Sequence, residues 1–117
     1  MIKTVKPPKL NVGDTIGIVA PSLPVLPQFR ENYEKGKKVL QELGFKLKEG
    51  RTIGLNRWYS AGTPQEQAED INSMFTDPNV KAVMAQTGGH TAISVLEHLD
   101  YDLIKANPKP FIGMSDM

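Results

Sequence analysis

TIGIVAPS, residues 15–22, is the stretch of sequence that most clearly indicates the fold class. It is almost continuously apolar and rich in β-branched residues until Pro21 and Ser22 end it. A run without alternation of polar and apolar residues is typical of a strand covered on both faces, as in a parallel sheet. VKAVMA at residues 80–85 and PFIG at residues 110–113 share this character, so we expect buried strands at residues 15–20, 80–85 and 110–113.

Helical patterns separate these runs. Residues 28–44, QFRENYEKGKKVLQELG, have apolar positions at roughly helical spacing and end on a glycine that suits a C-cap. Residues 63–75 begin with a capping box, TPQE, and a third helix is expected after residue 91, with a short helical piece near residues 102–106. The apolar positions of these helices are Phe29, Tyr33, Val39, Leu40 and Leu43 in the first, Ala68, Ile71, Met74 and Phe75 in the second, and Ile93, Leu96 and Leu99, expected to face inward, in the third.

Strands and helices therefore alternate along the chain, with a further short strand expected at residues 45–50 and a long loop at residues 51–62. This order is typical of a Rossmann-like α/β fold, a parallel sheet flanked by helices and joined by right-handed crossovers. In such sheets, ligands bind at the carboxyl ends of the strands. Ser22, Gly88-Gly89 and Ser115-Asp116 should therefore lie along one edge of the sheet.

The composition narrows the possible functions. The 117 residues are 39% hydrophobic and 23% charged, as in an ordinary globular domain, and a net charge of +1 gives no field for binding nucleic acid or an anionic membrane. The absence of cysteine excludes disulfides, thiolate nucleophiles and cysteine-bound metals. The sequence shows no secretory signal and no apolar stretch near the roughly 20 residues of a membrane span. We expect a cytoplasmic protein without nucleic-acid or membrane partners.

Gly88 and Gly89 follow one predicted strand and precede a helix. Such a pair can let the backbone approach a ligand closely, with helix N–H groups facing an anion or oxyanion, or it can simply make a tight turn. No GxGxxG motif is present, so a dinucleotide cofactor is not expected. His90 stands at this loop and can orient a ligand, whereas His98 is expected on a helix surface. Two histidines without paired carboxylates predict no metal site.

Ser115 closes the last predicted strand, as a nucleophile does in a strand-to-helix elbow, where the next N–H helps to form an oxyanion hole. Only the first glycine of GxSxG is present, so Ser115-Asp116 can also be an ordinary helix N-cap. A serine nucleophile needs a base, and neither histidine has the spacing of a catalytic triad.

Two other groups of residues could carry chemistry. Arg57-Trp58-Tyr59, in the long loop, can form a substrate wall or can pin the loop to the core. Glu69 and Asp70, in the second predicted helix, are interpreted as a solvated face rather than a catalytic pair.

Long segments of the chain resemble the N-terminal half of the LD-carboxypeptidase family, serine peptidases that include the microcin C self-immunity enzymes. These segments are GDTIGIVAPS at residues 13–22, AGTPQEQAEDINSMFTDPNVKAV at 61–83, TGGHTAISVLEHLDYDLIKANPKPFIG at 87–113, and the G-x-S-D end at 113–116. The resemblance covers essentially all residues from about Leu10 onward.

The resemblance implies a cytoplasmic serine hydrolase that cleaves an amide bond next to a carboxylate-bearing residue, without a cofactor or metal. Its substrate would be a murein L,D-peptide or a processed microcin, a peptide or peptidyl-nucleotide, and the full-length protein would be a homodimer. By the same likeness Ser115 is the nucleophile, and Gly88, Gly89 and the Asp116 N–H form the oxyanion hole.

Three further residues, His90, Trp58 and Ser22, are expected to contact the substrate. The loop Thr87-Gly88-Gly89-His90-Thr91 stands where many murein enzymes have an Arg-Gly-Gly-Tyr-Gly type loop, which favours the microcin-immunity branch.

The family's triad glutamate and histidine lie in a C-terminal domain, so residues 1–117 are interpreted as the N-terminal nucleophile-bearing domain alone. FIGMSDM, residues 111–117, would then be the nucleophile strand. We expect Gly88 or Gly89 to have positive φ, with both N–H groups directed toward Ser115, and we expect this chain by itself to be inactive. The alternative is a stand-alone α/β domain that binds a small ligand or a protein through the Gly-Gly edge.

Overall fold

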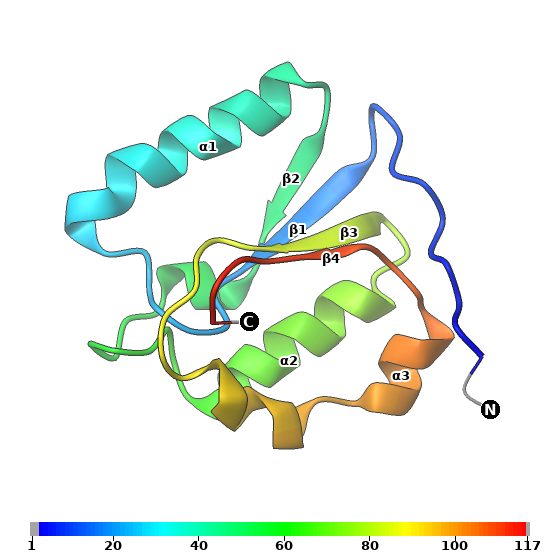
Figure 1. The fold of residues 1–117 in the computed structure, drawn as a ribbon. Helices are drawn as coiled ribbons and strands as arrows, with labels where there is room; N and C mark the ends of the chain where they lie inside the picture. Colours follow the sequence, from blue (N-terminus) through cyan, green and yellow to red (C-terminus); the bar gives the residue numbers. More distant parts are fainter. Residues whose placement is uncertain (1–2, 117) are drawn as a thin grey trace.

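Four runs of the chain pair side by side in one parallel sheet, in the order β2-β1-β3-β4 (Figure 1). They are β1 (Thr15–Val19), β2 (Lys46–Glu49), β3 (Val80–Ala85) and β4 (Phe111–Ile112) in the computed structural model, which describes residues 3–116. Met117, the last residue of the predicted nucleophile strand and of the predicted domain, lies outside the described residues. The parallel α/β fold predicted from the sequence is confirmed.

The two central strands are the buried ones. In β1, Ile16, Ile18 and Val19 are at most 3% exposed, and in β3 Val80 and Val83 are fully buried. These β-branched side chains suit a pleated surface that is covered from both sides. The prediction of buried strands from unalternated apolar runs is therefore confirmed for β1 and β3.

The last strand differs from the prediction. Only Phe111 and Ile112 pair with β3, opposite Val83 and Met84, and they remain 44% and 42% exposed. The prediction of a buried strand at residues 110–113 was wrong in this respect. The physical reason is position, because β4 is the edge strand and no element among residues 3–116 pairs with its outer side.

Helices α2 (Pro64–Thr76) and α3 (Tyr101–Ala106) cover one face of the sheet (Figure 1). Thr63 and Glu66 form the predicted capping box, in which each side chain accepts a hydrogen bond from the other's backbone N–H. The apolar side of α2 packs on β1 and β3 and makes the larger core cluster, as predicted. Its buried members are Val19, Ala68, Ile71, Met74, Phe75, Val80, Val83 and Val95.

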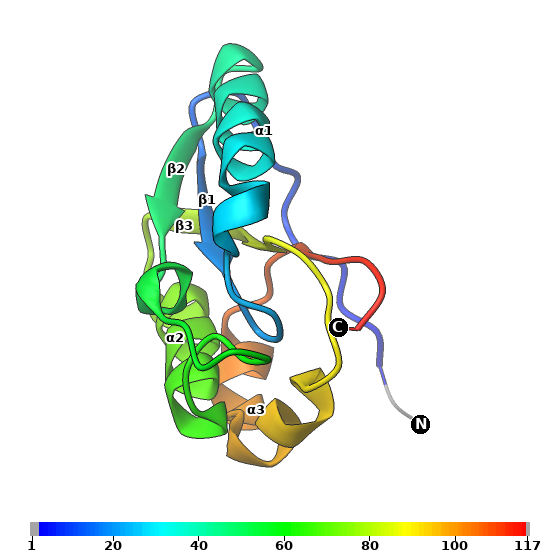
Figure 2. The ribbon, with the colours of Figure 1, turned by 90° about the vertical axis from the view of Figure 1, so that its left-hand side faces the viewer.

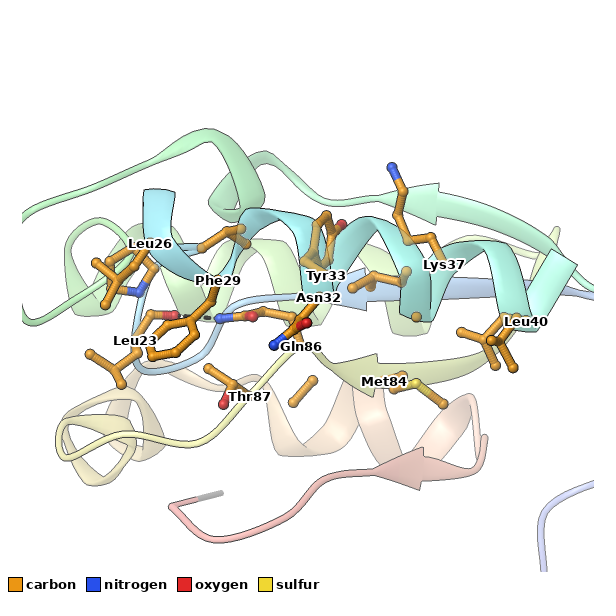
Figure 3. A pocket seen from close by; sticks show the side chains of 16 residues that line it. Leu23, Leu26, Phe29, Asn32, Tyr33, Lys37, Leu40, Met84, Gln86 and Thr87 are labelled. Atoms are coloured by element: carbon orange, nitrogen blue, oxygen red, sulfur yellow. Dashed lines mark hydrogen bonds between the residues drawn. The ribbon is translucent and has the colours of Figure 1, made fainter.

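Helix α1 (Arg30–Glu42), also predicted, lies on the opposite face, but none of its residues is buried. Phe29, Val39 and Leu43 are more than half exposed. Between α1 and the ends of β1 and β3 there is a cavity of about 600 Å³, lined mainly by apolar side chains (Figure 3). One face of the sheet is thus only partly covered by the residues that the structure describes.

The segment after the Gly-Gly turn is a 3₁₀ helix, η3 (Ala92–His98), where we predicted an α-helix. The prediction that Ile93 and Leu96 face inward was wrong, because they are 76% and 50% exposed. A 3₁₀ helix has three residues per turn, so Ala92 and Val95 share its inner side and are the buried ones. Leu99 packs against the core as predicted. A second 3₁₀ helix, η2 (Arg51–Gly54), begins the predicted long loop, and a third, η1 (Pro27–Phe29), precedes α1.

Candidate functional site

The carboxyl ends of β1, β3 and β4 bring three distant segments together. The chain end and the segment after β3 lie side by side in both views of the fold (Figures 1 and 2). The Leu23 N–H donates to the carbonyl of Gly88 over 3.2 Å, and the Ser22 hydroxyl donates to Asp116 Oδ2 over 2.7 Å. The structure therefore places Ser22, Gly88-Gly89 and Ser115-Asp116 at one sheet edge, as the sequence predicts.

Ser115 occupies a turn that follows the last strand after Gly113 and Met114. Its φ is 66°, and among residues 3–116 it shares a positive φ with only one other non-glycine residue, Trp58. This conformation costs an L-residue about 1–2 kcal/mol, so surrounding contacts must hold it. The Ser115 side chain is exposed, which leaves the hydroxyl accessible.

Gly88 lies directly against this turn. A Cβ added at Gly88 would stand 2.9 Å from Ser115 Cβ, from the Asp116 backbone nitrogen and from the Met114 carbonyl oxygen. Real Cβ atoms essentially never approach other atoms so closely, so only glycine allows the two backbones to meet here.

Gly89 supports the neighbouring contact with the loop after β1. Its φ of 155° is positive, so the prediction of positive φ at one of the two glycines is confirmed. A Cβ at Gly89 would stand 2.3 Å from Ser22 Oγ and 2.8 Å from the Leu23 nitrogen. That the N–H groups of Gly88 and Gly89 point toward Ser115 stays a prediction.

The Asp116 carboxylate fastens the turn to the rest of the domain. Its Oδ2 accepts from the Ala92 N–H over 3.0 Å as well as from the Ser22 hydroxyl. The Ala92 N–H, then the Ser22 hydroxyl, lower the pKa of Asp116 below its ordinary value, with a smaller contribution from nearby His90. The carboxylate is therefore ionised near neutral pH. The sequence predicted a backbone N–H role for Asp116, with a helix N-cap as the alternative, and this side-chain contact to distant segments was missed.

Ser22 is buried instead of facing a ligand. Its exposed fraction is 0%, and its hydroxyl oxygen accepts from the Thr91 N–H over 3.0 Å while it donates to Asp116. The Ser22 carbonyl accepts from Gln67 Nε2 and from the Ala61 N–H. Direct substrate contact, which we had expected of Ser22, is not possible in this arrangement, because surrounding segments occupy its hydrogen-bonding positions.

Asp70 is a correction to the sequence interpretation. It is 6% exposed, and its carboxylate accepts from the backbone N–H groups of Arg51 and Thr52, each over 3.0 Å, and from the Thr52 hydroxyl. Thr52 Oγ1 in turn accepts from the Ala20 N–H. Asp70 therefore supports the loop after β1 and is not part of a solvated face, whereas Glu69 is exposed as expected.

Gln67 was not identified by sequence reasoning. It is 1% exposed, and its Nε2 donates to the carbonyls of Ala20 and Ser22. A signal was available, since Gln67 and Asp70 fall at helical spacing with the buried Ala68, Ile71 and Met74. Polar side chains on the inner side of a helix need partners, which Gln67 Nε2 finds in the loop after β1 and Asp70 finds in η2. Gln67 Oε1 accepts no hydrogen bond from the described residues.

His90 and the loop after η2 frame a separate cavity of about 390 Å³ near the turn. Its lining includes Arg57, Tyr59, His90 and Thr91, the residue whose N–H binds Ser22. Trp58 is 88% exposed and does not line this cavity, so it does not pin the loop to the core. Arg57 and His90 give the cavity a basic wall that suits a carboxylate or another anion.

Residues 3–116 contain neither a metal-binding cluster nor a membrane-spanning helix. No group of three or more histidine, aspartate or glutamate side chains could hold a metal ion there. No helix in this part of the chain is long and apolar enough to cross a bilayer.

Residues 16–117 match the family model described as the LD-carboxypeptidase N-terminal domain. The chain is 40% identical over 107 residues to the microcin C7 self-immunity protein MccF of Escherichia coli, covering 92% of this chain and 31% of that protein. It is 37% identical over 112 residues to the probable murein peptide carboxypeptidase of Bacillus subtilis, covering 96% of this chain and 34% of that protein.

The fold agrees with a solved relative. The structure of MccF in complex with aspartyl sulfamoyl adenosine matches with a TM-score of 0.92 and 38% identity, over 96% of this chain and 33% of that one. The chain therefore spans about one third of the length of the relatives it matches.

Proposed function

Because the chain belongs to the LD-carboxypeptidase family, whose N-terminal domain its residues 16–117 match, we propose that it is the nucleophile-bearing domain of a serine carboxypeptidase. The observation that carries this proposal is the turn at Ser115, where a non-glycine residue with φ of 66° follows a strand and Gly88 lies against it. A strained, exposed serine at the carboxyl end of a parallel strand is the geometry that nucleophilic catalysis uses.

In the proposed reaction, Ser115 Oγ attacks the carbonyl carbon of an amide bond and forms a tetrahedral intermediate. The Asp116 N–H and the backbone of Gly88-Gly89 stabilise the negative charge on the carbonyl oxygen. The Ser115 proton passes to a base and then to the leaving amine, and water releases the acyl group from Ser115 in the second half-reaction.

We place the base outside this chain. His98 ends η3, six residues beyond Ala92, and its Nε2 lies 3.5 Å from Glu97 Oε1. His90 lines the cavity beside Arg57. The triad histidine and glutamate would come from the remaining two thirds of a full-length relative, and the chain alone would be inactive.

The substrate would carry a carboxylate near the cleaved bond, as in a murein L,D-peptide or a processed microcin. The basic cavity at Arg57 and His90 supports this class, and exposed Trp58 would meet the substrate from the rim. MccF has been solved with aspartyl sulfamoyl adenosine, whose aspartyl group bears such a carboxylate. That likeness and the Thr87–Thr91 loop favour the microcin-type substrate.

A chimeric protein tests the proposal. Residues 1–117 would replace the matched N-terminal third of MccF, and hydrolysis of aspartyl sulfamoyl adenosine and of a murein tetrapeptide would be measured, together with labelling by a serine-directed fluorophosphonate. We expect labelling and turnover that Ser115→Ala abolishes, and neither in the 117-residue chain alone. Removal of a triad member costs several orders of magnitude, so the difference would be clear.

Two outcomes would contradict the proposal. Stoichiometric labelling of the isolated chain would mean that the base is already present within it. If the chimeric protein folds well but neither reacts with the fluorophosphonate nor hydrolyses either substrate, the result would favour the alternative of a stand-alone ligand-binding domain.

A further inference from the structure

One buried hydroxyl and one carboxylate connect the loop after β1 to the turn of Ser115. We propose that Ser22 and the Asp116 carboxylate are positioning residues that hold Ser115 in its strained conformation and aim the Asp116 N–H. This inference rests on the proposed role of Ser115 as nucleophile. It goes beyond that role, because it explains how the turn is held.

The turn has few other supports. β4 pairs with β3 through two residues, both more than two-fifths exposed, and the Ser115 side chain is exposed as well. A backbone at φ of 66° relaxes unless its surroundings fix it. Asp116 is the next residue, so fixing its side chain also fixes the peptide between Ser115 and Asp116.

Ser22 is well suited to be the anchor. Its side chain is completely buried, and its carbonyl is held by Gln67 and Ala61. The Thr91 N–H occupies a lone pair of the Ser22 oxygen over 3.0 Å, which leaves the hydroxyl proton free to point at Asp116 Oδ2. Ser22 therefore presents a buried donor at 2.7 Å from Asp116 Oδ2, closer than the Thr91 hydroxyl oxygen at 3.3 Å.

The contacts of Asp116 also distinguish this interpretation from an ordinary N-cap. The carboxylate binds Ser22, 94 residues away in sequence, and the Ala92 N–H, 24 residues away. Both partners belong to segments that follow other strands. The side chain thus connects the segments that follow β1, β3 and β4. A helix N-cap would instead accept from N–H groups two or three residues further along the chain.

The isolated 117-residue chain gives the first test. NMR would measure the backbone conformation of Ser115 and the pKa of Asp116 in the wild type, in Ser22→Ala and in Ser73→Ala. Ser73 is the control for loss of a hydrogen-bonded hydroxyl away from the turn, because it is exposed and its hydroxyl donates to the Asp70 carbonyl within α2. We expect Ser22→Ala alone to release the positive φ of Ser115 and to raise the pKa of Asp116 toward 3.8, its ordinary value.

The chimeric protein gives the second test. Ser22→Ala should lower kcat and the rate of fluorophosphonate labelling about 10- to 100-fold with little change in KM, because misplacement by about 1 Å can cost that much. Asp116→Asn keeps one acceptor oxygen and should lose less than Asp116→Ala. Ser73→Ala should match the wild type.

The results separate this inference from the proposed function. If Ser22→Ala retains the positive φ of Ser115, or labels within twofold of Ser73→Ala, the positioning role is wrong even though Ser115 reacts. If wild-type Ser115 does not label at all, the proposed function fails, while the NMR comparison still decides whether Ser22 holds the turn. If Ser22→Ala does not fold, Asp116→Ala and Asp116→Asn provide the same comparison.

Discussion

At Gly88, the space of one methyl group decides whether the turn of Ser115 can form. An added Cβ would lie 2.9 Å from three atoms of residues 114–116, two of which belong to the backbone and cannot rotate away. The φ of Gly88 is not in the positive range, so the need for glycine here is close approach and not conformational freedom. The requirement at Gly88 is therefore purely steric.

We predict that Gly88→Ala lowers the free energy of unfolding by about 1–3 kcal/mol, the usual cost of overpacking. Chemical denaturation of the 117-residue chain would measure it. Gly36→Ala, inside α1 with no atom within 4 Å of the added Cβ, is the control and should stabilise by about 0.5–1 kcal/mol. Equal effects of the two substitutions would show that Gly88 is not crowded.

The Asp116 carboxylate gives the turn a pH dependence. Its pKa is lowered in the folded protein, so its stabilising contribution is present above the ordinary value of 3.8 and is lost as the pH falls through the lower folded value. We predict that the Ala92 amide resonance, whose N–H donates to Asp116, shifts in this acidic range and that the shift disappears in Asp116→Asn. A shift centred at or above 3.8 would contradict the assignment.

At the level of secondary-structure elements, Asp70 connects α2 to η2 and, through Thr52, to the end of β1. We predict that Asp70→Ala destabilises the chain by about 2–5 kcal/mol, because it leaves two backbone N–H groups and a hydroxyl without their charged acceptor. Glu69→Ala, on the exposed side of α2, should change stability by less than about 0.5 kcal/mol. Thermal unfolding would compare them, and similar losses would refute the role of Asp70.

Elements whose sequence carries a clear local pattern were predictable, whereas features that depend on contacts distant in sequence were not. The apolar runs of β1 and β3 and the capping box of α2 are local signals. The 3₁₀ geometry of η3 depends on how Ala92 and Val95 meet the core, and the exposure of β4 depends on its place at the edge of the sheet. Neither is encoded in a short window of sequence.

The site was predictable to the same extent. Gly88-Gly89 and Ser115-Asp116 follow strands, so the rule for parallel sheets placed them at one edge. The contacts between Ser22, Asp116 and Ala92 depend on side-chain directions across three loops, which spacing alone does not specify. For the same reason Ser22 was expected to face the substrate and is instead buried.

For the whole molecule, one conspicuous surface is the apolar face between α1 and the sheet. Leu23, Phe29, Val39, Leu40 and Met84 line its cavity of about 600 Å³ (Figure 3). Phe111 of β4 does not extend this face, because it lines a separate cavity with residues of α2 and α3. Exposed apolar surface like that around the first cavity favours association.

We predict that the 117-residue chain self-associates at high micromolar concentration through this face, as sedimentation velocity would detect. Val39→Lys, which puts a charge on the cavity wall where the side chain is 54% exposed, should reduce association without unfolding. Val12→Lys, at a valine outside that wall and 77% exposed, is the control and should not. Equal association of both variants would place the contact elsewhere.

The bond between Ser22 and Asp116 joins positions 94 residues apart in a chain described from residue 3 to residue 116. Closing so long a loop is costly in entropy until the sheet has already brought its ends together. The turn of Ser115 should therefore form late and open early, through local opening that leaves β1 and β3 intact. In hydrogen exchange, the Ser115 and Asp116 amides would exchange orders of magnitude faster than those of the central strands, so the proposed nucleophile would lie on a turn that opens while the sheet stays closed.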